Sequence, residues 1–511
     1  MKYFIPAWYY TEGWWHDRAR PYYDASHTKS EFDDMVSLMG MYYNNDKPFH
    51  MIVLNYFTDL RTFLYRNQLF ETSYWSVFDN IQGFEQLTPK PIDFRDLNWP
   101  EGTDFIYTPY TVRAITSEST YSIIHFSQTG YLIWIESYTD KVKTHRYVFD
   151  DRGVLSSIVS FNANNEPILL KLMSVDGDVV LTEDIQTGIV TIEEGYRDQF
   201  SQVQYQTMPE LIEERLKGYL SKLPKAQVIA ASDERHLAVL NRIISSENLT
   251  YSVFTKRNKV ISEQMLDAML HANHWIVDTQ ENEKLLEQNK PSDLLRVTPF
   301  NTQMMSGVSS QLYDTYIGVN IDGIEEQRVL NIVDDLVEYV KDNERMKITL
   351  ITREDAYTKQ YLNQVIEDIN TYFLEQEDNF ELFNKEEIEA AKVIKLISVP
   401  FENDLIKAIS EIRLLIDLNQ EPDLFLQICC ISAGIPQVNS RETDYVLDNV
   451  NGMIINNDED LILALNFYLA VLKNWNKSLA YTMKLTQKYA SINIIEQLER
   501  FIEGEAYEKK V

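Results

Sequence analysis

The chain has 511 residues, and its 44% apolar and 24% charged content is typical of a soluble globular protein with two to four domains. Its net charge of −31 argues against nucleic-acid binding and against simple electrostatic adhesion to anionic lipid. No run approaches the ~20 apolar residues of a membrane span, the N-terminus lacks a signal-peptide pattern, and the adjacent Cys429 and Cys430 cannot form a disulfide framework. We therefore expect a reducing cytoplasm as the location.

Residues 1–73 predict the first part of a Rossmann-like domain. Lys2–Ile5 and Phe49–Leu54 are short apolar runs typical of buried strands. Glu31–Met41 has the apolar spacing of a helix, and a second helix is expected to begin near Asp59.

Residues 74–199 have a different pattern: short runs in which apolar and polar residues alternate are separated by turn signals such as Asp176-Gly177. No helical pattern interrupts these runs, so they predict an antiparallel β-domain. The seven expected strands are Tyr121–Phe126, Tyr131–Ser137, His145–Phe149, Val154–Phe161, Ile168–Met173, Val179–Thr182 and Gly188–Ile192.

Residues 200–300 return to alternating helices and strands, so the β-domain is predicted to be an insertion into the first Rossmann-like domain. The expected helices are Pro209–Leu220, Glu234–Ile244 and Ser262–His271, and the expected strands are Gln227–Ala230, Tyr251–Thr255 and Trp275–Val277.

Residues 301–477 predict a second Rossmann-like domain, and 478–511 a last helix, about 478–503, with a polar tail. Parallel strands need crossover helices, which this alternation supplies. The expected strands are Tyr316–Ile321, Ile348–Thr352, Val393–Val399, Leu424–Ile428 and Gln437–Asn439, and the expected helices are Glu325–Asp342, Tyr357–Phe373, Asp404–Ile416 and Asp460–Asn474.

Residues 421–436 carry the spacing of a sugar-transfer site. Retaining glycosyltransferases built from two Rossmann-like domains place a Glu, seven residues and a second Glu before a Gly-x-Pro turn. Glu421, Gly434 and Pro436 match this pattern, but Cys429 stands at the second carboxylate position. A thiol cannot make the hydrogen bonds of a carboxylate to a nucleotide-sugar ribose. The spacing predicts a vestigial site on an α/β, GT-B-like fold whose two Rossmann-like domains face a cleft; an ordinary strand–turn–strand is the alternative.

Two further features bear on this site. Gly452 is the last residue of an acidic-x-x-Asn-Gly pattern, which follows the site in such transferases. The Arg and Lys that should hold the diphosphate are missing, because Val319 or Asn320 replaces the Arg and Glu325 and Glu326 stand where cations are needed. Arg328 lies several residues out of register.

Other chemistry is disfavoured. His271 and His274 have zinc-like spacing without a third ligand nearby, so we expect a structural pair and no metal. Phosphate-binding glycine motifs and a Gly-x-Ser-x-Gly elbow are absent from the sequence. Apolar residues flank Cys429, so a buried small side chain is favoured over a nucleophile.

An aromatic loop follows the first strand and is a second candidate site. Its side chains could stack on a sugar or a partner protein, and burial as a lid on the first domain is the alternative. The residues are Trp8, Tyr9, Tyr10, Trp14 and Trp15.

Three segments carry a resemblance to a known family: the opening Tyr3–Tyr9, the element Ser76–Gln82, and the degraded site between Glu421 and Pro436. Over essentially its whole length, the chain resembles the first family of the Asp series of accessory Sec proteins. That family belongs to the dedicated export system for serine-rich-repeat glycoprotein adhesins in Gram-positive bacteria.

The resemblance implies a cytosolic pseudo-glycosyltransferase that has no catalytic residues and no cofactor. It also implies binding to two sibling accessory proteins and to the accessory SecA motor ATPase, near the inner face of the membrane, and recognition or delivery of the glycosylated adhesin. The competing hypothesis is an active retaining glycosyltransferase that uses Glu421 with a nucleotide sugar.

Overall fold

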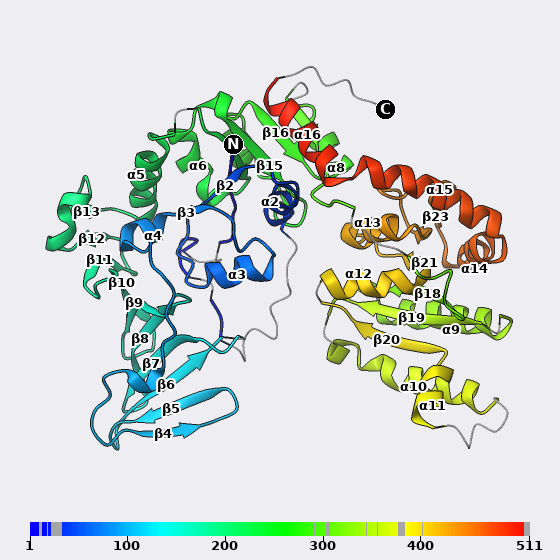
Figure 1. The fold of residues 1–511 in the computed structure, drawn as a ribbon, viewed down its shortest axis with the longest axis horizontal. Coiled ribbons are helices and arrows are strands. Elements are labelled where there is room, and N and C mark those ends of the chain that lie inside the picture. The colour runs from blue at the N-terminus through cyan, green and yellow to red at the C-terminus, as the bar shows by residue number, and fades with distance from the viewer. Residues whose placement is uncertain are drawn as a thin grey trace. The chain divides into compact units, whose positions relative to one another are not determined.

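The computed structural model describes residues 1–9, 13–17, 19–21, 33–127, 129–223, 225–289, 293–302, 307–343, 345–354, 356–376, 384–400 and 402–504. Within these ranges the chain forms two compact units, shown in Figure 1. Unit 1 contains the chain up to Asp278 together with Leu285–Leu295. Unit 2 contains Thr279–Lys284 and the chain from Arg296 onward.

Unit 1 is built on a seven-stranded sheet in the order β17-β16-β15-β14-β1-β2-β3. The pairings described from β16 to β3 are parallel, and helices supply the crossover connections. The strands are β1 (Lys2–Ile5), β2 (Phe49–Val53), β3 (Tyr74–Ser76), β14 (Gln227–Ala231), β15 (Leu249–Val253), β16 (His274–Val277) and β17 (Leu294–Arg296). The helices are α2 (Asp34–Asn44), α3 (Leu60–Arg66), α4 (Val77–Gln82), α5 (Met208–Leu220), α6 (Glu234–Ile243), α7 (Glu263–Met269) and α8 (Gln280–Leu286), the last with residues in both units.

The Ser76–Gln82 element is the end of β3 followed by α4. Ser76 caps α4 by accepting a hydrogen bond from the backbone N–H of Asp79, and Gly83 ends the helix at φ 73°. Because β3 pairs with β2, this segment belongs to the α/β sheet, and the inserted sheet begins only after it.

Between α4 and α5 the chain forms a ten-stranded antiparallel sheet, in sequential order from β13 to β4. Seven of its strands lie where the alternation predicts them, whereas β4, β5 and β13 are additional. Two of these lack an alternating signal, since β13 has two residues and β4 is largely exposed. The strands are β4 (Asp104–Tyr107), β5 (Thr111–Ile115), β6 (Thr120–Phe126), β7 (Leu132–Thr139), β8 (Val142–Asp150), β9 (Val154–Phe161), β10 (Pro167–Met173), β11 (Val179–Asp184), β12 (Val190–Ile192) and β13 (Gln204–Tyr205).

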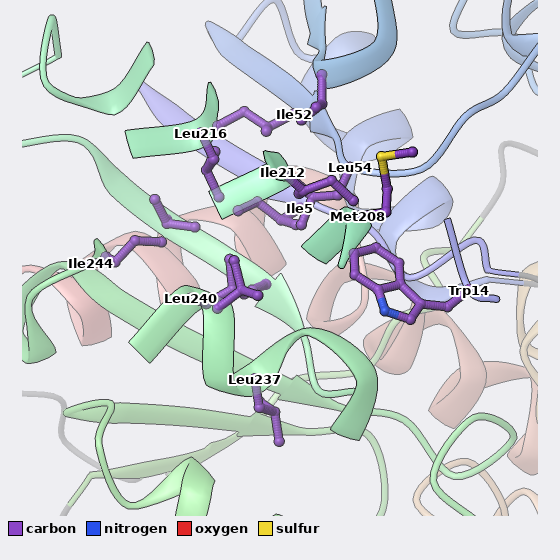
Figure 2. Close-up of a cluster of buried hydrophobic side chains, with 14 of the residues drawn as sticks. Ile5, Trp14, Ile52, Leu54, Met208, Ile212, Leu216, Leu237, Leu240 and Ile244 are labelled. Carbon is purple, nitrogen blue, oxygen red and sulfur yellow. The ribbon is translucent and has the colours of Figure 1, made fainter. Parts of the chain in front are cut away.

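The inserted sheet shares its hydrophobic core with the α/β part of unit 1. Leu172 and Ile192 of the insertion belong to the same buried cluster as Ile5 of β1 and Leu216 of α5. Figure 2 shows the part of this cluster in which side chains of β1, β2, α5 and α6 gather with Trp14. The insertion is therefore packed into unit 1 along one continuous core.

Buried polar contacts cross the same boundary. Gln82 Nε2 of α4 donates to the carbonyl oxygen of Met173 at 2.8 Å. Arg152, in the turn between β8 and β9, donates to Asp150 at 2.6 Å and to Asp79 of α4 at 2.7 Å. Since all three charged side chains are almost fully buried, the network joins α4 to the insertion.

Unit 2 is built on a six-stranded sheet in the order β20-β19-β18-β21-β22-β23, and every pairing is parallel. The strands are β18 (Thr315–Asn320), β19 (Met346–Thr352), β20 (Ile394–Ser398), β21 (Ile412–Asp417), β22 (Gln437–Asn439) and β23 (Gly452–Ile454). The helices are α9 (Glu326–Lys341), α10 (Tyr361–Leu374), α11 (Lys385–Ala391), α12 (Glu402–Glu411), α13 (Leu424–Ala433), α14 (Leu461–Leu465), α15 (Leu472–Lys488) and α16 (Ser491–Ile502).

Two element predictions in unit 2 exchange helix and strand, and a third, the helix Asp460–Asn474, is interrupted between α14 and α15. The segment predicted as the strand Leu424–Ile428 is the helix α13, and the predicted helix Asp404–Ile416 ends at Glu411 and gives way to the strand β21. Both errors have one physical cause. A helix that is buried nearly all round and a buried strand are each continuous apolar runs, so periodicity cannot separate them.

The C-terminal helix also differs from its prediction. In place of one helix over about 478–503, α15 begins at Leu472 and α16 begins at Ser491. The break occurs because Ala490 is extended (φ −63°, ψ 137°) and precedes α16 as its N-cap. The tail after Gly504 lies outside the described residues. No helix in the described ranges is long and apolar enough to cross a membrane.

Candidate functional site

Glu421 lies in the loop that joins the carboxyl end of β21 to α13, and its side chain is exposed. Its backbone N–H donates to Oδ1 of Asn419 at 3.1 Å. Ligands of open α/β sheets bind outside the carboxyl ends of the strands. The position of Glu421 is therefore compatible with the role that its spacing predicts.

Cys429 lies in the middle of α13 and is 1% exposed, and the neighbouring Cys430 is 0% exposed. Both thiols are free. Burial raises the pKa of the Cys430 thiol well above its usual value. The second carboxylate position of the motif thus lies within the core of unit 2 and not at its surface.

Gly434 and Gly452 have packing roles that need no ligand. Gly434 ends α13 at φ 73°, and a Cβ added there would lie 2.5 Å from the Leu479 side chain. A Cβ on Gly452 would lie 2.6 Å from the carbonyl oxygen of Gln437. The carbonyl oxygen of Pro436 accepts a hydrogen bond from Leu415 of β21 at 3.2 Å. Close packing therefore explains the two glycines, whereas the contact of Pro436 uses a backbone carbonyl that any residue would supply.

The carboxyl edge of this sheet carries a row of buried polar side chains that the sequence analysis did not identify. Asn320, Asp417 and Asn439 end the neighbouring strands β18, β21 and β22. Asn320 Nδ2 donates to Oδ1 of Asp417 at 3.2 Å, and Asn439 Nδ2 donates to the carbonyl oxygen of Asp417 at 3.3 Å. One signal could have found Asp417, which directly follows the apolar run Leu414–Ile416, whereas Asn439 follows a single apolar residue, Val438.

Asp417 is fully buried, and this burial, followed by the nearby charge of Asp423, raises its pKa to about 7. Its Oδ2 accepts a hydrogen bond from the backbone N–H of Asp423 at 3.1 Å. Asp423 in turn caps α13 by accepting from Phe425 and Leu426. Asp417 therefore supports the loop that carries Glu421.

The cations near this edge are held by carboxylates of the same unit. Arg353 Nη1 lies 3.5 Å from Oδ2 of Asp423. Lys359 Nζ lies 3.4 Å from Oε2 of Glu354 and 3.8 Å from Oδ1 of Asp322. A diphosphate would have to compete with these internal partners and would meet their negative charge.

Arg328, the out-of-register cation, is also paired. It donates to Oδ1 of Asp458 at 2.8 Å and to the carbonyl oxygen of Leu418 at 3.2 Å. Glu325 and Glu326 are exposed where α9 begins. The surface depression beside this pair is polar and partly acidic, and it is lined by Arg328, Gln420, Asn456, Asn457, Asp458 and Glu459.

The aromatic loop packs mainly within unit 1. Trp8 is 3% exposed and contacts Phe63 at a ring distance of 4.6 Å, and Trp14 is 7% exposed. Because their rings are covered, neither offers a stacking face to a ligand in this conformation. Tyr9 and Trp15 are partly exposed, while Tyr10 lies outside the described residues.

The polar atoms of Tyr9 and Trp15 have partners inside unit 1. Tyr9 Oη lies 2.5 Å from Nδ1 of His236, and Trp15 Nε1 donates to Glu183 at 3.1 Å. The pKa of His236 is lowered to about 4, first by burial. These contacts hold the aromatic loop against β14–α6 and the inserted sheet.

Of the two histidines in the zinc-like spacing, His274 begins β16 and His271 lies three residues before it. His271 Nε2 lies 2.9 Å from the carbonyl oxygen of Ile244, a structural contact. Within the described residues, no group of three or more His, Cys, Asp or Glu side chains is arranged to hold a metal ion.

Comparison with known proteins identifies both the family and the fold. The family model for the first accessory Sec system protein of the Asp series matches residues 1–505. A Staphylococcus aureus protein with the same description is 41% identical over 515 residues, which cover 99% of each chain. The solved structure of accessory secretory proteins 1, 2 and 3 of Streptococcus pneumoniae contains a chain that is 26% identical, with a TM-score of 0.82 and 99% coverage of both chains.

A catalytic glycosyltransferase shares the fold. The pneumococcal O-GlcNAc transferase GtfA, solved with UDP and GlcNAc, superposes with a TM-score of 0.67 over 99% of this chain and 100% of its own, at 10% identity. At this identity the likeness concerns the fold alone. The predicted GT-B-like class, with its parallel sheets and inserted antiparallel sheet, is confirmed.

Proposed function

We propose, from the fact that this chain belongs to the first Asp-series family of accessory Sec system proteins, that it is a non-catalytic member of a protein-export assembly. In this role the GT-B-like fold provides binding surfaces and does not transfer sugar. Its proposed partners are two sibling accessory proteins, the accessory SecA motor ATPase and the glycosylated serine-rich-repeat adhesin, in the cytoplasm close to the membrane.

One observation carries the non-catalytic part of the proposal. Cys429, at the second carboxylate position, is enclosed in the core, so no group at that position can reach a nucleotide ribose. The cations that remain near the same edge support this reading, because Arg353 and Lys359 already face carboxylates of their own unit.

The similarity to the pneumococcal complex supports the sibling partners. In that complex, accessory secretory proteins 1, 2 and 3 are crystallised together, and the matching chain aligns with this one over 99% of both lengths. A shared fold over this length preserves the backbone framework on which an interface is built. The motor ATPase and the adhesin remain proposals from the family resemblance.

A turnover assay tests the absence of catalysis. Purified full-length protein is incubated with a panel of UDP- and GDP-sugars, and release of nucleotide is followed. We expect release no faster than without protein. The active-transferase alternative, favoured by the exposed Glu421 at the sheet edge, predicts release that Glu421→Ala abolishes.

An assembly assay tests the export role. The full chain is co-expressed with the two sibling accessory proteins from its own organism, and the complex is isolated by size exclusion with mass determination by light scattering. We expect one species containing all three chains. Separate elution of this chain at micromolar concentration would contradict the proposal.

A further inference from the structure

Helix α15 carries a stripe of lysines on a strongly acidic chain. Its seventeen residues include Lys473, Lys477, Lys484 and Lys488 and no Asp or Glu, although the whole chain has 78 acidic and 47 basic residues. At 3.6 residues per turn these four positions fall within about 60° of one another, along about 22 Å of the helix. All four side chains are exposed.

No ion pair joins these four lysines to a described residue. Two other lysines of unit 2 differ in this respect, since Lys341 pairs with Glu338 and Lys392 pairs with Glu389. Lys473 and Lys477 are four residues apart, as are Lys484 and Lys488. Each such pair of like charges destabilises an isolated helix by about 0.2–0.5 kcal/mol. The lysine stripe therefore lowers the stability of α15 slightly, and no ion pair with a described residue offsets this loss.

The opposite face of α15 is already occupied. Trp475 and Leu485 are buried, and Trp475 Nε1 donates to the carbonyl oxygen of Arg413 at 3.0 Å. Ser478 Oγ donates to the carbonyl oxygen of Asn451 at 3.2 Å. The helix is thus fixed in unit 2, and its exposed side carries the four lysines, the uncharged Asn476, Ala480 and Gln487, and two exposed apolar side chains, Leu472 at 60% and Met483 at 64%.

We propose that the α15 lysine stripe docks an acidic segment of one of the two sibling accessory proteins, an assignment that rests on the proposed function. Complementary charge makes an anionic partner favourable at this face and repels other basic surfaces. The exposed Met483 thioether can pack against apolar side chains beside the acids.

A protein segment fits this surface better than a bilayer does. An amphipathic helix binds a membrane by burying its apolar face among the lipids, and the apolar face of α15 is committed to the core of unit 2. A flat anionic bilayer would also meet the remaining surface of a chain with net charge −31, whereas a narrow acidic segment meets the stripe alone.

The experiment uses charge reversal in the full chain. The stripe variant changes Lys473, Lys477, Lys484 and Lys488 to Glu. The matched control changes four exposed lysines on other helices or their ends, Lys217, Lys222, Lys385 and Lys407, to Glu, with the same change in net charge. Circular dichroism and thermal unfolding verify that both variants fold, and a Lys→Gln version of the stripe removes charge without adding repulsion.

Binding to the purified sibling pair is measured by calorimetry at low and high salt. We expect the stripe variant to weaken the dissociation constant at least about tenfold and the control to change it less than about twofold. The wild-type affinity should fall with salt more steeply than that of the Gln version.

Three results would overturn the assignment. Equal affinity of the wild type and the stripe variant removes the stripe from the interface. Absence of any binding by the wild type rejects the assembly itself. The third result comes from phosphatidylglycerol vesicles. If the wild type binds them and the stripe variant does not, while both bind the siblings equally, the lysines belong to a membrane surface.

Discussion

Cys429 is 1% exposed, and α13, the helix that carries it, packs against α12 and α15. The spacing from Glu421 to Pro436 is enough to predict, from the sequence alone, that Cys429 replaces the second carboxylate of the motif. Its orientation toward the core depends on the helical register of α13, whose first residues, Leu424–Ile428, were predicted as a strand. The identity of the residue and its burial were thus both predictable, the burial from the apolar neighbours of Cys429, whereas the helix that carries it was not.

Restoring a carboxylate at position 429 should harm the protein and not activate it. Cys429→Glu places an unpaired charge in the core, so we expect unit 2 to lose about 3 kcal/mol of stability or more. Cys429→Ala, which removes only the sulfur, should cost about 1 kcal/mol. Urea unfolding of both variants checks this, and a stable Cys429→Glu protein that binds a UDP-sugar would contradict the account.

Asp417 predicts a pH dependence of unit 2. The folded pKa of about 7 exceeds the unfolded value of about 3.9, so the folded state binds more protons between these values. The contribution of Asp417 to the free energy of unfolding should therefore be greatest below about pH 4. It should fall as the pH rises to about 7 and stay constant at higher pH. The full change is at most about 4 kcal/mol.

Hydrogen exchange of peptides from β21 and α13, measured between pH 5 and 8 after correction for intrinsic exchange, follows this effect. Asp417→Asn should abolish the slope, and Asp404→Asn, at an exposed position on α12, should leave it intact. An unchanged slope in Asp417→Asn would assign the dependence to another group.

At the scale of elements, prediction succeeded where two faces of a segment differ. The helix α9 buries Val329, Ile332, Val333 and Leu336 along one stripe, so its period is visible in the sequence. Strands β6 to β12 are short runs bounded by turn residues such as Asp176-Gly177, and those turns mark them in the sequence. Prediction failed at α13 and β21, which are buried along nearly their whole length. The division of the C-terminal helix at Ala490 also escaped notice, because no Gly or Pro marks it.

The Arg152 network is an element-scale test of how the insertion is attached. Arg152→Met leaves Asp79 and Asp150 buried without their cation, so we expect unit 1 to lose about 3–5 kcal/mol. Arg95, which pairs with Asp93 on the exposed surface of the same insertion, provides the control, and Arg95→Met should cause no measurable change. Thermal unfolding distinguishes them, and equal midpoints would show that the network contributes nothing.

At the scale of the whole molecule, the change in texture at residues 74–199 was sufficient to predict an insertion into a Rossmann-like domain. The shared core was not predictable, because Leu172, Ile192 and Leu216 are distant in sequence and only the fold brings them together. Likewise, a net charge of −31 predicts an acidic surface but not the segregation of four lysines onto α15.

The central claim is that the GT-B-like fold is retained without nucleotide-sugar binding. Calorimetric titration of the full chain with UDP- and GDP-sugars at millimolar concentration tests it most directly. We predict heats equal to those of dilution for the wild type and for Glu421→Ala alike. Saturable binding with a dissociation constant below about 1 mM, lost in Glu421→Ala, would contradict the account.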